Sequence, residues 1–150
     1  MITRFLSASL LGTLGLLICL AAYPAGAPAE LAFQAQLIWG TNGDKPADKP
    51  LKEVDAKLQE SLKKIFKWKN YYEVKRAAVT TGKDSKKVKL SDKCEIQVQD
   101  LGASRVEVRL FGEGNLVTKS TQPLVSGEPI VLGGFSKNDT AWFIVLTPSK

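Results

Sequence analysis

Residue types that carry catalytic chemistry are sparse in this 150-residue chain, which contains no histidine. That absence excludes Ser-His-Asp and Cys-His nucleophile systems, His-ligated metals and histidine-based pH switching. Two carboxylates alone can hydrolyse a glycosidic bond, but Glu95, Glu107, Glu113, Glu128 and Asp139 show no spacing that forces any pair to converge. We therefore expect no enzymatic activity and no cofactor. The alternative is a carboxylate-dependent hydrolase or transferase acting on cell-wall or glycan polymers.

Cys94 is the only cysteine outside the apolar N-terminal stretch that holds Cys19. No second thiol is present to resolve a redox centre and no histidine to activate it. Cys94 alternates in step with Ile96 and Val98, so core packing is favoured over a redox role or an intermolecular bridge. We expect no internal disulfide.

The most distinctive chemistry lies in residues 63–76, where basic and aromatic side chains interleave. Cations can neutralise phosphate or carboxylate while aromatic faces stack on bases or sugars. In the simpler, structural explanation the aromatics seat the end of a helix against the next strand. The candidate binding residues are Lys63, Lys64, Lys67, Trp68, Lys69, Tyr71, Tyr72, Lys75 and Arg76.

Positive charge is concentrated in the middle of the chain, whose overall net charge is +6. Residues 44–93 hold 15 Lys or Arg against 8 Asp or Glu, whereas residues 94–150 hold 5 against 6. This distribution favours an anionic envelope polymer or lipid as partner, with ordinary solubility as the simpler explanation. An envelope protein that adds a strand to an exposed sheet edge is a second possible partner. No specific nucleic-acid target is expected.

Residues 1–29 have the layout of a secretory signal peptide, with Arg4 before an apolar stretch and small residues after it. We predict cleavage after Ala29. Cleavage after Ala27 also fits the small-residue pattern, but it would place Pro28 directly after the broken bond, which signal peptidases disfavour. A lipoprotein anchor at Cys19 lacks the small residue expected just before it. An uncleaved membrane anchor is the stronger rival, since the apolar stretch just reaches spanning length. We expect one exported domain, residues 30–150, in the periplasm or outside the cell.

The mature chain begins with a strand and a helix. Residues 31–39 alternate between apolar and mostly polar or small side chains, which predicts a strand with one buried face. A loop rich in helix breakers follows to Pro50, with Asp48 as a plausible N-cap. An amphipathic helix is predicted near residues 50–67, because apolar residues recur at steps of three and four: Leu51, Val54, Leu58, Leu62, Ile65 and Phe66.

The rest of the chain reads as short strands separated by turns. The predicted strands lie within 71–80, 88–90, 94–98, 106–110, 116–121, 130–132 and 141–147. Such spacing predicts an α+β fold that is mainly an antiparallel β-meander, built as a sheet, a sandwich or a small barrel, with the one helix covering a face or an end. The expectation is an exported, basic, non-catalytic binding or assembly module that engages an anionic partner.

Overall fold

The structure, a computed structural model, describes residues 29–149, with the side chains of 134–137 left out. The predicted signal peptide therefore lies, except for Ala29, outside the described residues. The elements in chain order are β1 (Leu31–Thr41), β2 (Lys52–Glu53), α1 (Ala56–Ile65), β3 (Asn70–Thr81), β4 (Lys86–Lys89), β5 (Cys94–Gly102), β6 (Arg105–Gly112), β7 (Asn115–Pro123), β8 (Ile130–Lys137) and β9 (Thr140–Pro148). The fold is mostly antiparallel β-sheet with one short helix, which confirms the α+β class.

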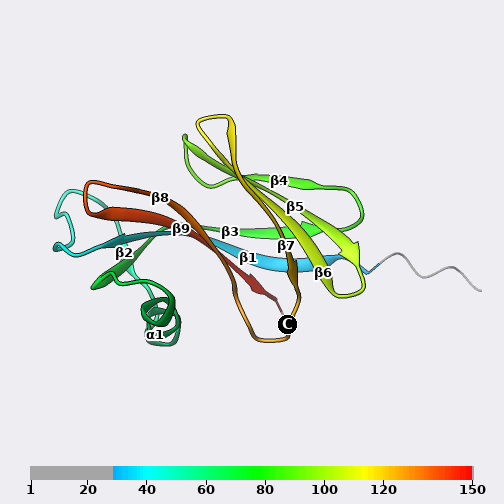
Figure 1. The fold of residues 1–150 in the computed structure, drawn as a ribbon, viewed down its shortest axis with the longest axis horizontal. Helices are drawn as coiled ribbons and strands as arrows, with labels where there is room; N and C mark the ends of the chain where they lie inside the picture. Colours follow the sequence, from blue (N-terminus) through cyan, green and yellow to red (C-terminus); the bar gives the residue numbers. More distant parts are fainter. Residues whose placement is uncertain (1–28, 150) are drawn as a thin grey trace, which may run out of the picture.

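The strands form two antiparallel sheets, which lie against each other in Figure 1. The four-stranded sheet has the order β4-β5-β6-β7 and is a true meander. The five-stranded sheet has the order β2-β3-β1-β9-β8, so a meander was the wrong expectation there. The reason lies in β1, whose middle is buried on both faces from Ala35 to Ile38. Burial on both faces is typical of a central strand in a sheet that has a layer on each side, and β1 pairs with β3 along one edge and with β9, the last strand, along the other.

Two hydrophobic clusters hold three layers together. The larger cluster lies between the sheets and joins Phe33 and Leu37 of β1 to Ile96 of β5 and Val108 of β6. The smaller cluster lies on the opposite face of the five-stranded sheet, where Leu62 of α1 packs with residues of β1, β3 and β9. Figure 1 shows α1 on the side of this sheet that faces away from the four-stranded sheet.

The helix is shorter than its predicted range of 50–67 and begins later. Asp55, not Asp48, is the N-cap, and its side chain accepts a hydrogen bond from the Leu58 amide at 3.0 Å. The two residues of β2 pair with β3 instead of entering the helix, because their backbone groups bond across to Glu73 and Tyr72. Leu51 is nevertheless buried, as its place in the apolar pattern predicted. The spacing of apolar residues alone does not show where an extended segment ends and the following helix begins.

Candidate functional site: the basic end of helix α1

The end of α1 and its connection to β3 form a fixed corner of the molecule. The helix ends at Ile65, and the Phe66 amide still donates to the Leu62 carbonyl at 2.8 Å. The loop after β1 then holds the connection, because the Lys69 amide donates to Asn42 Oδ1 at 3.2 Å. The Asn70 side chain donates to the Gly43 carbonyl at 3.0 Å. These bonds fix the backbone that carries the lysines of this segment.

The aromatic residues beside this corner pack against the smaller cluster. The rings of Phe66 and Phe143 lie 4.1 Å apart between centroids, and Trp68 is half-buried beside Gly40. Tyr71 is fully buried, and its hydroxyl donates to the Leu62 carbonyl at 3.4 Å. Burial raises the pKa of Tyr71, so the group remains a neutral donor. The arrangement matches the structural explanation of this segment, in which aromatics seat the helix end on the next strand.

Tyr72 lies on the opposite face of the five-stranded sheet. It is buried, and its ring lies 6.0 Å from that of Trp39, its cross-strand neighbour. Consecutive residues of a strand point to opposite faces, so Tyr71 and Tyr72 cannot share one surface. Neither tyrosine exposes a ring that a partner could contact. Of the predicted aromatic residues, only half-buried Trp68 reaches the surface.

Four lysines at this corner are exposed and are not engaged by acidic groups. We call Lys63, Lys64, Lys67 and Lys69 the lysine cluster. Within residues 29–149 no ion pair involves any of the four, whereas lysines of the four-stranded sheet pair with carboxylates, as Lys87 does with Glu95 at 3.3 Å. The stretch from Ser61 to Tyr72 contains no acidic residue. The cluster is therefore a local excess of uncompensated positive charge.

The last two predicted cations lie apart from the lysine cluster. The Arg76 guanidinium donates to the Glu73 carboxylate, with a shortest distance of 2.6 Å, and Gln36 donates to the same carboxylate at 2.6 Å. Burial acts to raise the pKa of Glu73, but these hydrogen bonds outweigh it and the pKa lies below its usual value. Lys75 is opposite Leu37 in the register, on the sheet face away from α1. Arg76 is thus engaged by Glu73, and Lys75 lies on the sheet face opposite the helix, so neither belongs to the lysine cluster.

The sequence pattern was wrong about the burial of Ile65, the last residue of α1. Its position in the apolar stripe predicted burial, yet the side chain is 60% exposed. Leu58 and Leu62 are the buried residues of α1, and Phe66 after the helix packs on Phe143, whereas Ile65 between them is exposed. An exposed isoleucine therefore lies in the same short segment of the chain as the four lysines.

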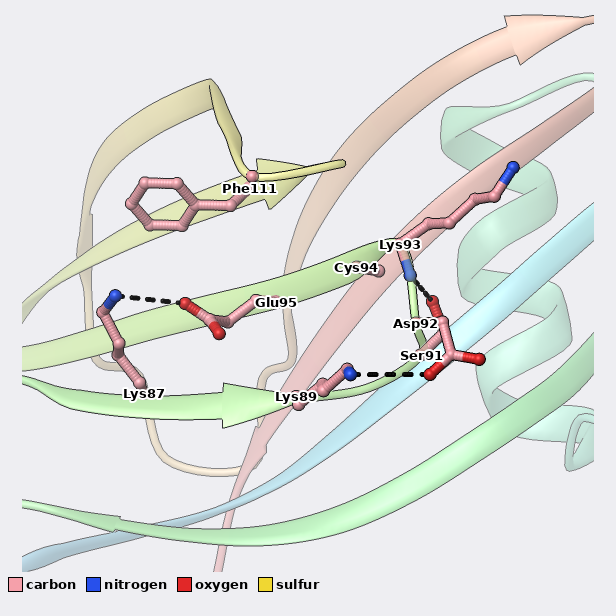
Figure 2. Close-up of a pocket in the computed structure, with 9 residues that line it drawn as sticks. Lys87, Lys89, Ser91, Asp92, Lys93, Cys94, Glu95 and Phe111 are labelled. Carbon is pink, nitrogen blue, oxygen red and sulfur yellow. Dashed lines mark hydrogen bonds and ion pairs between the residues drawn. The ribbon is translucent and has the colours of Figure 1, made fainter.

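A second group of charged residues surrounds a hollow of about 360 Å³ on the four-stranded sheet, shown in Figure 2. Its lysines are compensated internally, since Lys89 pairs with Asp92 at 3.4 Å and Lys93 pairs with Glu113 at 3.3 Å. Cys94 lines the hollow and is half-buried. Its side chain packs against the larger cluster, as the alternation with Ile96 and Val98 predicted, but it is not fully inside the core. Burial raises the pKa of its thiol, which disfavours the reactive thiolate.

Known proteins offer no guide to this site. No family model matches the chain, and neither the characterised proteins nor the solved structures contain a significant match to it. In the part of the chain that the structure describes, no group of three or more acidic or cysteine side chains is placed to hold a metal ion. No helix between residues 29 and 149 has the length and apolar character to cross a bilayer.

Proposed function

We propose that this protein is an exported, non-catalytic binding module whose lysine cluster engages an anionic partner of the cell envelope, either a polymer or a lipid. The observation that carries the proposal is the group of four exposed lysines without acidic partners. Such a group raises the local concentration of anions and accelerates their encounter with the surface. Export through the signal peptide at residues 1–29 supplies the envelope as the place of action.

The fold supports the proposal because it presents the cluster rigidly. Lys63 and Lys64 occupy the last turn of α1, where cations complement the helix dipole. Lys67 and Lys69 lie on the extended connection that the Asn42 and Gly43 bonds hold in place. A fixed array of cations loses less conformational entropy on binding than a flexible tail does.

A second candidate function, recruitment of an envelope protein by strand addition, is favoured by one observation. β7 is an edge strand of nine residues with a single charged residue, Lys119, and no strand pairs with its outer side in the part of the chain that the structure describes. The other edge of that sheet, β4, is four residues long and carries three lysines, which disfavours strand addition. Main-chain pairing at β7 predicts binding that depends weakly on salt, in contrast to the lysine cluster.

The lysine cluster is tested by replacing all four of its residues, as Lys63→Gln, Lys64→Gln, Lys67→Gln and Lys69→Gln. Each exposed charge contributes about 0.5 kcal/mol, so the affinity for a soluble polyanion such as polyphosphate is expected to fall about 30-fold. Titration of the purified protein at low and at moderate salt measures the affinity. Wild-type affinity is expected to fall steeply between the two salt concentrations.

A matched control removes the same amount of charge elsewhere, at Lys83, Lys86, Lys87 and Lys89, which are also exposed. This control variant is expected to keep its affinity within about threefold, because distant exposed charges are largely screened. If both variants lose affinity equally, net charge alone explains binding and the cluster is not a site. If neither variant loses affinity, the proposal is wrong.

A further inference from the structure

The exposed Ile65 distinguishes between the anionic partners that the lysine cluster could engage. Soluble polyanions offer charge but no apolar phase in which an isoleucine side chain could be buried. A lipid bilayer offers both, with anionic headgroups above a hydrocarbon boundary. We infer that the lysine cluster and Ile65 together dock on the surface of an anionic lipid bilayer. The inference rests on the proposed function and narrows it to one partner.

The order of residues at the end of α1 suits this contact. Ile65 directly follows Lys63 and Lys64 and is followed, after Phe66, by Lys67 and Lys69. Lysine side chains can lay their aliphatic stems along an apolar surface while their ammonium groups reach the headgroups. Ile65 is the one large apolar side chain of this corner that is mostly exposed, and the lysines precede and follow it in the chain. Trp68, which is half-buried, adds an indole ring, and tryptophan is enriched at the interface between water and the hydrocarbon of a membrane.

Charge complementarity selects an anionic bilayer over a neutral one. No acidic residue lies between Ser61 and Tyr72, and the nearest acids in the chain, Glu60 and Glu73, flank that stretch. Glu73 is already held by Arg76 and Gln36 on the sheet. Each lysine near an anionic surface strengthens binding about fivefold, so four together give a useful affinity without any inserted helix.

The contact is a shallow one that a short helix can make. α1 has 10 residues, too few to cross a bilayer, and its Leu58 and Leu62 are already buried against the sheet. Only Ile65, the last residue of α1, is mostly exposed and available for insertion. A protein–protein interface normally has a buried core of several aromatic or arginine side chains, and a single exposed isoleucine is too little apolar surface to form one. A lipid surface requires no such core.

Vesicle binding with two matched variants tests the inference. The purified protein is sedimented with vesicles of equal parts phosphatidylglycerol and phosphatidylcholine, and with vesicles of phosphatidylcholine alone. We expect binding to the first and not to the second. Ile65→Ser is expected to weaken binding to the anionic vesicles about tenfold, because most of an isoleucine side chain would no longer leave water. Its affinity for polyphosphate is expected to stay unchanged.

Leu116→Ser is the control, because Leu116 on β7 is similarly exposed, at 54%, but lies outside the lysine cluster. It is expected to bind both vesicles and polyphosphate as wild type does. If wild type and Ile65→Ser bind the anionic vesicles equally, the claim that Ile65 inserts into the bilayer surface is wrong. Binding to polyphosphate but not to anionic vesicles overturns the lipid inference and leaves the proposed function standing. Binding to neither overturns both.

Discussion

Leu62→Ala is expected to lower the free energy of unfolding by about 3 kcal/mol, since removing a fully buried leucine leaves a cavity that its neighbours fill only in part. Leu62 has no exposed surface and lies in the smaller cluster with Tyr71 and Phe143. Its carbonyl also accepts hydrogen bonds from the Phe66 amide and the Tyr71 hydroxyl. Urea denaturation followed by circular dichroism measures the loss.

Ile65→Ala provides the control on the same helix. Because Ile65 is 60% exposed, its truncation is expected to change the free energy of unfolding by no more than about 0.5 kcal/mol. Equal losses for the two variants would contradict the placement of α1, which the structure seats through Leu62 and not through Ile65. This seat matters for the proposed function because it fixes the helix backbone that carries Lys63 and Lys64.

Gly40→Ala is the second substitution with a large expected effect, about 2 kcal/mol of destabilisation. A Cβ at Gly40 would lie 2.7 Å from Phe143 Cε2 and 3.0 Å from Trp68 Cδ1. Phe143 is buried and cannot move aside, so the added methyl group must displace Trp68 or strain the sheet. Thermal unfolding measures the loss, and a shift in tryptophan emission reports the displacement of the indole.

Gly82→Ala is the matched control, because a Cβ at Gly82 would meet no atom within 4 Å. It is expected to unfold within about 0.5 kcal/mol of wild type. A Gly40→Ala protein that is as stable as Gly82→Ala, with unchanged emission, would show that Trp68 does not pack on β1. The connection between α1 and β3 would then lack the support that presents Lys67 and Lys69.

The strands were the most predictable part of the fold, because alternation is a local signal. Phe33, Ala35 and Leu37 share one buried face of β1, as their spacing predicted. The order of strands was not predictable, since nothing local in β1 states that it pairs with both β3 and β9. The two-residue β2 was missed for the same reason: its only distinguishing property is its pairing with β3.

The candidate site was predictable in its charges and not in its aromatic residues. Lysines are costly to bury, so the exposure of Lys63, Lys64, Lys67 and Lys69 follows from their type. Whether a tyrosine is exposed depends on what packs on its face of the sheet: Tyr71 packs in the smaller cluster, and the ring of Tyr72 lies beside that of Trp39 on the other face. The exposure of Ile65, close in the chain to buried Leu62, depends on how α1 is seated on the sheet, which is a property of the tertiary fold.

Amide chemical-shift mapping shows where an anionic partner binds on the protein. Polyphosphate is added to the isotopically labelled protein, and the shift of each backbone amide is followed to saturation. We expect the largest changes between residues 61 and 70, with small changes at the charged hollow around Lys87 and Lys93. Largest changes at that hollow or along β7, or no saturable change at all, would contradict the proposed function.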